Sequence, residues 1–312
     1  MVDRKGDIYF SDLETVWRLS ADGRMSVFRP GIPETHVHEL ALAADGAIEG
    51  DQNRYDPATQ RYYTGLWSRT PSGAETAIVA MTERPPGGAG VLQDKDGNRY
   101  VTQWVSNDDR RMQLLRRRPD GRSDLLFDQT RGASPPVART VAGVAGMAFA
   151  SDGSLYFAAG GTLRRRARDG SVSSVYTGGK ASSLRGLGVT EDGRVLAADM
   201  GLRTVLAIGA DGGTAILYKE SEPWLPTAAA ASKGRLIVLE ANADPHEYND
   251  RVRLIEVKDG RTRLLASPGR ARRTAESRPS QSRGSGQGRI ILLGGLATAA
   301  LCLVWLMRAK AR

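Results

Sequence analysis

Tight turns followed by short β-rich runs recur along residues 1–267. Six of these runs read GDIYFSD, GAIEGDQ, GNRYVTQ, GSLYFAA, GRVLAAD and GRLIVLE. Each begins at the glycine of a Lys-Gly or Asp-Gly pair, and these glycines are Gly6, Gly46, Gly97, Gly153, Gly193 and Gly234. An Asp-Gly pair between apolar runs favours a two-residue β-hairpin, because type I′ turns need positive φ. The pattern therefore predicts six β units at intervals of 40 to 56 residues.

A second turn follows each run and leads into another short strand. These turns are Asp22-Gly23, Ser72-Gly73, Asp120-Gly121, Asp169-Gly170, Asp211-Gly212 and Asp259-Gly260. Each unit thus predicts four strands, the first of them rich in small residues, as in ELALAA, VAGMAFA, RGLGVT and PTAAAA. Small residues suit the innermost position around a central channel, and four-stranded units of this period indicate a β-propeller. We predict an all-β, six-bladed β-propeller over residues 1–267. A β-sandwich is the alternative, and the doubled turn pattern argues against it.

The repeated units also resemble a known superfamily. Segments such as SDGSLYFAAGGTLRRRARDGSVSSVY and KGDIYFSDLETVWRLSADGRMSVF look like NHL-type repeats. They are similar to blades of the SMP-30/gluconolactonase/strictosidine-synthase group of six-bladed propellers. The resemblance covers residues 1 to about 267 and implies the fold. It implies less about activity, because these families include binding platforms, lactonases and other enzymes.

The first unit departs from the others. Only residues 1–5 precede its turn, so its innermost strand is almost wholly missing. After the last strand, near Ala266, the chain passes into an Arg-rich segment, and nothing obvious closes the ring. An incomplete inner blade leaves unpaired strand edges. We therefore expect the natural N-terminus to lie upstream of Met1; an intact mass of 33.6 kDa for the native protein would contradict this.

The C-terminal part has a different composition. Residues 268–289 are rich in Arg, Ser, Gly and Pro, which is typical of a disordered linker. Residues 290–307 read IILLGGLATAALCLVWLM, 18 residues without a charge. As a helix this run is about 27 Å long, close to the roughly 30 Å hydrocarbon core of a bilayer. We predict a transmembrane helix over 290–307 and a basic tail over 308–312, with a buried core helix as the alternative.

The charges on either side of the apolar run predict its orientation. Six arginines precede it closely, and three basic residues follow it. The positive-inside rule then places the upstream side in the cytoplasm, and no N-terminal signal peptide is visible. We expect a single-pass, tail-anchored membrane protein whose propeller faces the cytosol. If a signal peptide precedes Met1, the orientation reverses and the propeller is exported.

Charge and cysteine content exclude some classes of protein. The net charge is +9, but residues 268–312 hold nine Lys or Arg and one acidic residue, so the propeller itself is nearly neutral. A broad nucleic-acid-binding surface is therefore not expected. The one cysteine, Cys302, permits neither an intrachain disulfide nor a cysteine-based zinc site.

Candidate chemistry gathers on the propeller face opposite the Asp-Gly turns. That face surrounds the channel mouth, where ligands of such folds are expected. The longest loops predicted there are 51–62, 103–111 and 240–250. His36 and His38 lie two residues apart in an extended stretch and share a side, so they are the candidate metal ligands, with His246 or Glu39 in support. The alternative is that they are loop histidines that make ordinary hydrogen bonds.

Polar residues also recur at the end of each second strand. Counted six residues after the turn glycine, this column reads Asp12, Gln52, Gln103, Ala159, Asp199 and Glu240. Such side chains either reach the channel mouth or tie the following loop to neighbouring backbone. The candidate ligand-binding residues at the mouth are His36, His38, Glu39, Asp51, Asn53, Gln103, Arg185, Asp199, Glu240 and His246.

The resemblance to lactonases is tested by their ligand pattern. Those enzymes hold a divalent metal with Glu, Asn and Asp at the starts of inner strands. Here the Glu belongs to the strand that is missing, Ala145 stands where the Asn is expected, and Arg185 stands where the Asp is expected. No catalytic residue can be carried over from the family. We expect a membrane-tethered binding or interaction module for a protein or small ligand, with no cofactor assigned. The alternative is a divalent-metal-dependent hydrolase of the lactonase or arylesterase class with a rearranged site, holding one metal ion.

Overall fold

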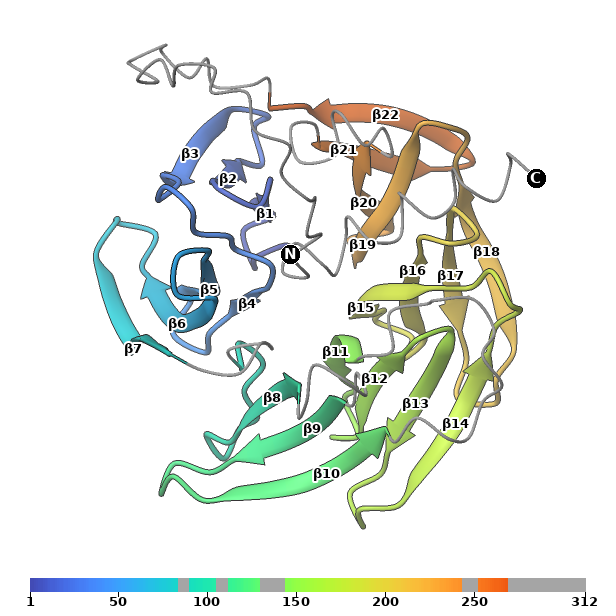
Figure 1. Ribbon diagram of the computed structural model, residues 1–312. Coiled ribbons are helices and arrows are strands. Elements are labelled where there is room, and N and C mark those ends of the chain that lie inside the picture. The colour runs from blue at the N-terminus through green and yellow to red at the C-terminus, as the bar shows by residue number, and fades with distance from the viewer. Residues whose placement is uncertain (84–89, 105–111, 130–143, 243–251, 269–312) are drawn as a thin grey trace, which may run out of the picture.

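A computed structural model describes residues 1–83, 90–104, 112–129, 144–242 and 252–268. These residues form 22 strands in six antiparallel sheets, arranged in a ring (Figure 1). Blades 1 to 3 comprise β1 (Ile8–Ser11), β2 (Val16–Leu19) and β3 (Met25–Arg29); β4 (Leu40–Leu42), β5 (Ile48–Asp56), β6 (Arg61–Arg69) and β7 (Glu75–Glu83); and β8 (Arg99–Trp104), β9 (Met112–Arg117) and β10 (Ser123–Gln129). Blades 4 to 6 comprise β11 (Val144–Phe149), β12 (Leu155–Ala159), β13 (Thr162–Arg166) and β14 (Val172–Thr177); β15 (Leu184–Val189), β16 (Val195–Asp199), β17 (Thr204–Ile208) and β18 (Thr214–Lys219); and β19 (Trp224–Ser232), β20 (Arg235–Asn242), β21 (Val252–Lys258) and β22 (Arg261–Ala266). The predicted six-bladed β-propeller is confirmed.

Two of the six sheets have a reduced inner strand. In blades 1 and 3 single bridges take its place, Val2 with Ile8 and Gln93 with Arg99. In blade 1 the Met1 amino group donates to the Tyr9 carbonyl at 2.9 Å, and the Tyr9 N–H donates back to the Met1 carbonyl at 3.0 Å. The prediction of a nearly missing first strand is confirmed, and the existence of upstream residues stays a prediction.

The apolar core lies between blades rather than inside one. β16 is buried along its whole length, and its alternate residues face opposite neighbours, since successive strand side chains point to opposite faces. Val195 and Ala197 pack with blade 4, whereas Leu196 packs with blade 6. Buried clusters of this kind lie at all six junctions between neighbouring blades. The junction of blades 6 and 1 closes the ring by packing Ile8 and neighbouring side chains against β20 and β21.

The small residues of the inner strands are there because backbones approach closely. A Cβ added to Gly186 of β15 would lie 2.7 Å from the Thr227 carbonyl oxygen of β19. One added to Gly146 of β11 would lie 2.5 Å from the Arg185 carbonyl oxygen. The crowding expected at the channel is therefore present in blades 4 to 6.

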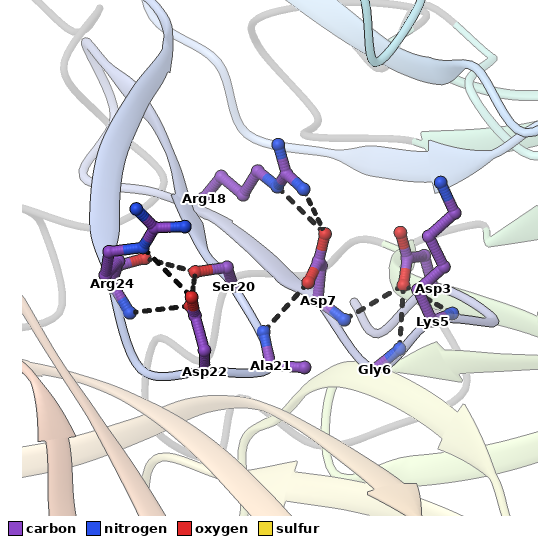
Figure 2. A network of polar contacts seen from close by, with 9 residues as sticks. All are labelled: Asp3, Lys5, Gly6, Asp7, Arg18, Ser20, Ala21, Asp22 and Arg24. Atoms are coloured by element: carbon purple, nitrogen blue, oxygen red, sulfur yellow. Dashed lines mark hydrogen bonds and ion pairs between the residues drawn. The ribbon is translucent and has the colours of Figure 1, made fainter.

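Aspartates hold the hairpin turns in shape. In Figure 2 one carboxylate oxygen of Asp3 accepts three backbone N–H groups, from residues 5 to 7, each at 2.9 Å. Asp7 accepts two hydrogen bonds from Arg18 and one from the Ala21 N–H, which links the first turn of the blade to its second. Gly6 has a φ of +95°, which the turn requires and most other residues avoid.

Some predicted features take another form or lie elsewhere. Residues 51–62 do not form a loop, because β5 and β6 extend into one long hairpin whose strands pair as far as Asp56 and Arg61. Residues 105–111 and 243–251, with His246, and the segments 269–289, 290–307 and 308–312 lie outside the described residues. Across the ranges that the structure does describe, no helix has the length and apolar character needed to cross a bilayer.

Candidate functional site

Five of the candidate residues come together at the inner edge of blade 2. His36, His38 and Glu39 lie just before β4, and Asp51 and Asn53 lie on β5. The backbones of His36 and Asn53 exchange two hydrogen bonds of 2.8 Å, which fixes the approach to β4 against β5. We call these five residues the blade-two cluster. Because β4 is the first strand of its sheet, the cluster lies on the channel side of the blade (Figure 1).

A buried carboxylate organises the blade-two cluster. Asp51 is fully buried, and one of its oxygens accepts the backbone N–H groups of His38 and Glu39, both at 2.8 Å. Its other oxygen accepts the Asn53 side-chain amide at 2.5 Å. Backbone N–H donors satisfy a buried carboxylate well, since charge-assisted hydrogen bonds are the stronger kind. Asp51 therefore fixes the backbone positions of residues 38 and 39, from which their side chains project.

The amide of Asn53 fixes the tautomer of neutral His38. The Asn53 carbonyl oxygen accepts from the Thr64 hydroxyl at 3.0 Å, which orients the amide nitrogen toward Asp51 and toward His38 Nδ1, 3.2 Å away. Nδ1 is then the acceptor, and the proton of the neutral ring is on Nε2. The His38 side chain is 47% exposed, so this Nε2–H is a donor available to a ligand.

The protonation of the cluster is tuned toward neutral pH. Burial lowers the pKa of His38, but the Asp51 carboxylate 3.6 Å away and the charge of Glu39 outweigh it, and the pKa is raised. Burial, together with the charge of Asp51, raises the pKa of Glu39 to about 7, against the opposing effect of His38. Burial, and then the charge of His38, lowers the pKa of His36. Glu39 can therefore gain or lose a proton near neutral pH.

The two histidines are only partly arranged as metal ligands. Their ring centroids lie 6.1 Å apart with a tilt of 50°, and the buried Nδ1 of His36 has no hydrogen-bond partner among the described residues. His38 Nδ1 is already engaged by Asn53. The part of the chain that the structure describes contains no group of three or more His, Cys, Asp or Glu side chains placed to hold a metal ion.

Asp199 and Glu240 also serve neighbouring groups. Asp199 is fully buried and accepts the Ser182 hydroxyl at 2.5 Å, the Ser183 N–H at 2.9 Å and the Leu202 N–H at 3.1 Å. This is the structural role considered for the column of strand-end residues. Asp12 has it too, because its carboxylate accepts backbone N–H groups of the following loop.

Glu240 is the centre of a buried network between blades 5 and 6. It accepts Arg253 Nε at 2.6 Å and the Tyr218 hydroxyl at 3.0 Å, and Arg253 also bonds Glu220 at 2.7 Å. The Arg253 guanidinium stacks 4.3 Å from the ring centre of Trp224. Burial raises the pKa of Glu240, while Arg253 opposes the shift. The network joins two blades and leaves the carboxylate no exposed surface.

The remaining candidates are spread over other blades. Arg185 lies on the inner strand β15, as expected, and Gln103 lies near the end of β8, opposite Gln113. In blade 2 the column position falls on Gln52, whose carbonyl accepts Arg29 at 2.9 Å, on the opposite face of β5 from the cluster. Asp51, one residue earlier, has the role that Asp199 has in blade 5. Counting from the turn glycine therefore chose the wrong residue of β5, because adjacent strand residues face opposite ways.

Comparisons with known proteins identify the fold. Neither a scan against protein-family models nor a search of curated protein sequences found a match. Among solved structures, the nidogen/laminin complex has a chain that matches with a TM-score of 0.55 at 13% identity, over 84% of this chain and 93% of that one. Virginiamycin B lyase from Staphylococcus aureus matches with 0.53 at 14%, over 85% and 82%. A gluconolactonase from Xanthomonas campestris matches with 0.52 at 15%, over 75% and 79%.

These matches are to a chain of the nidogen/laminin complex, a lyase and a gluconolactonase. At such low identity they establish architecture and leave activity open. The predicted resemblance is confirmed at the level of the fold: the chain is a six-bladed propeller of the kind seen in SMP-30/gluconolactonase-like proteins and virginiamycin B lyase.

Proposed function

We propose that this chain is a membrane-tethered binding module whose propeller takes a polar ligand at the blade-two cluster. The observation that carries the proposal is the contrast between enclosed and accessible polar groups. Asp199 and Glu240 are enclosed by their partners, whereas His38 is held by Asn53 yet half exposed. With Nε2–H as donor and the Glu39 carboxyl close to its pKa, the cluster can both donate to and accept from a ligand. This suits a carbonyl, amide or carboxylate group.

The test is a ligand screen on the full-length protein. Thermal melts with a set of polar metabolites and short peptides would be compared for wild type, His38→Ala and a control, Ser183→Ala, in blade 5, where the Ser183 N–H is bound by Asp199. A ligand that binds the native state raises Tm by mass action. We expect a ligand whose Tm shift persists in Ser183→Ala and is lost in His38→Ala. Tm shifts that are equal in all three proteins would contradict the proposed site.

A metal-dependent hydrolase of the lactonase or arylesterase class is the second candidate. Its support is the fold shared with a gluconolactonase and the placement of His38, whose pKa is raised, beside Glu39, whose pKa is raised to about 7. Melts of the full chain with EDTA, then with calcium, zinc or manganese, separate the two functions. A metal-dependent rise in Tm with turnover of gluconolactone or phenyl acetate, both lost in His38→Ala, would favour the hydrolase over the binding module.

The proposed tether is the apolar segment 290–307. Its support is length and the lack of charge over 18 residues. The full chain should stay with membranes after alkaline carbonate extraction and be released by detergent. Protease protection of the propeller in intact vesicles would then distinguish the exported from the cytosolic orientation. Release by carbonate alone would contradict the tether.

A further inference from the structure

A second candidate site lies between blades 1 and 2, away from the blade-two cluster. A cavity of about 170 Å³ is lined by Arg18 of β2, by Val27 and Phe28 of β3, and by Arg69 and Ser72 at the β6–β7 turn. In the pairing of β5 with β6, Arg69 lies opposite Ile48, whereas the cluster residue Asn53 lies opposite Thr64. Five residues along a strand is about 17 Å, so the cavity and the cluster are separate sites.

The two arginines keep hydrogen-bond donors beyond those that their partners use. Arg18 donates from Nε and Nη2 to the single oxygen Oδ2 of Asp7. Arg69 donates from Nη1 to Glu75 at 3.1 Å, and its buried Nε has no hydrogen-bond partner within the described ranges. A guanidinium has five N–H donors, and a buried donor left without a partner is costly. An oxyanion in the cavity would accept from the Nη donors of the two arginines that Asp7 and Glu75 leave unused.

The other blades provide an internal comparison for this cavity. Five of the six second turns are Asp-Gly, and only blade 2 has Ser72-Gly at this place. In blade 4, Arg166 corresponds to Arg69, and its Nη2 lies 3.2 Å from the Cβ position of the turn glycine, against 3.5 Å for Arg69. Hydrogen bonds from the following serine and, to a smaller extent, the charges of nearby arginines including Arg166 lower the pKa of Asp169 in that turn. Blade 2 thus keeps the arginine and lacks the turn carboxylate.

We propose that this cavity binds a small phosphate monoester, with its phosphoryl group between Arg18 and Arg69. Guanidinium groups match phosphate oxygens with paired N–H donors. The apolar wall that meets the organic part is Val27, which is 51% exposed, since Phe28 beside it is buried. Ser72 leaves room for the anion where an aspartate would repel it.

The test is calorimetric titration of the full-length protein with inorganic phosphate and with phenyl phosphate, at constant ionic strength. We expect saturable binding of phosphate with a Kd of about 1 mM and several-fold tighter binding of phenyl phosphate. Ser72→Asp restores the turn sequence of the other blades, so the variant should fold normally. Its affinity for both ligands should be about tenfold or more weaker. Absence of saturable binding to wild type, or equal binding by Ser72→Asp, would overturn the proposal.

Two variants make the result specific. Ser72→Ala removes only the hydroxyl and should keep most of the affinity. Ser173→Asp adds a carboxylate at an exposed serine of β14 and should bind phosphate like wild type. If Ser173→Asp weakens binding as much as Ser72→Asp, the loss of affinity comes from the change in net charge. The proposed location of the site would then be wrong. Equal affinity for phosphate and phenyl phosphate would overturn the role of the apolar wall.

Discussion

Two junctions of the ring are built in different ways. Between blades 4 and 5 the contact is apolar, and Leu163, Leu184, Leu206 and Ile208 are all nearly or completely buried. Between blades 2 and 3 the described residues bury only Leu66 and Val91 as a cluster. There Glu49 of β5 and Arg99 of β8 form a bidentate ion pair, with N–O distances of 2.8 and 3.2 Å.

The comparison shows that neighbouring blades of one propeller can be held together either by apolar packing or by an ion pair. Burial of apolar side chains contributes roughly 25 cal/mol per Å² without requiring a fixed partner. A desolvated ion pair contributes little net stability, yet it is costly to break, because the remaining charge stays buried. The Glu49 and Arg99 side chains are 10% and 17% exposed, so the second case applies. The junction of blades 2 and 3 should therefore be the more sensitive to loss of a single charge.

The largest expected effect is the loss of that charge. Glu49→Ala should lower the free energy of unfolding by about 3–5 kcal/mol, because Arg99 keeps its charge without a carboxylate and is left with the neutral Gly90 carbonyl as acceptor. Urea denaturation of the full chain measures this. Glu83→Ala, in a pair with Arg61 whose side chains are 52% and 56% exposed, is the control and should cost less than about 1 kcal/mol. Equal effects of the two substitutions would mean that the junction does not depend on the ion pair.

The sequence predicted what depends on local pattern. Turn glycines, the four-strand period and small inner-strand residues all follow from positions close in the chain, and the structure has the six blades that they predict. The pairing of Glu49 with Arg99 joins residues 50 positions apart, and no local pattern indicates it.

The candidate site was predictable in part. The His-x-His spacing pointed to residues 36 and 38, and the structure does place them beside Asp51 and Asn53. The role of Asp51 as the clamp of the cluster was missed, because counting from the turn selected Gln52. The strand alternation separates the two residues, since Gln52 bonds Arg29 on the face of β5 opposite to Asp51.

The second prediction concerns the crowded half of the ring. Gly186→Ala places a methyl group within 2.8 Å of Ala228 Cβ and still closer to the Thr227 carbonyl oxygen, so β15 and β19 must separate. We expect a loss of about 1–3 kcal/mol in the free energy of unfolding. Gly179→Ala is the control, since its added Cβ meets no atom within 4 Å. If both variants melt like wild type, the inner strands of blades 4 to 6 are not tightly packed.

The smallest expected effect is a pH dependence of stability. It distinguishes two buried carboxylates, Asp51 and Asp199, that both bind backbone N–H groups. Asp51 clamps His38 and Glu39, which titrate, whereas Asp199 clamps Ser182 and Ser183, which do not. Glu39 has a folded pKa of about 7 against an ordinary value of 4.5, so the native state keeps a proton that the unfolded state has released. Stability should therefore fall as pH rises from about 4.5 to 7, and the raised pKa of His38 extends the loss to higher pH.

This pH dependence is tested with Glu39→Gln, which keeps the size of the side chain and cannot ionise. Wild type should lose of the order of 1–2 kcal/mol relative to Glu39→Gln between pH 4.5 and 7, less than the full shift implies because the Glu39 side chain is only partly buried. Urea denaturation in parallel over this range measures the contribution of Glu39 together with its effect on His38, since the other groups titrate in both proteins. Ser183→Ala, in blade 5 beside Asp199, should run parallel to wild type at every pH. A difference between wild type and Glu39→Gln that is independent of pH would show that Glu39 ionises as freely in the folded ring as in the unfolded chain. The blade-two cluster would then have no advantage over blade 5 as an acid–base site.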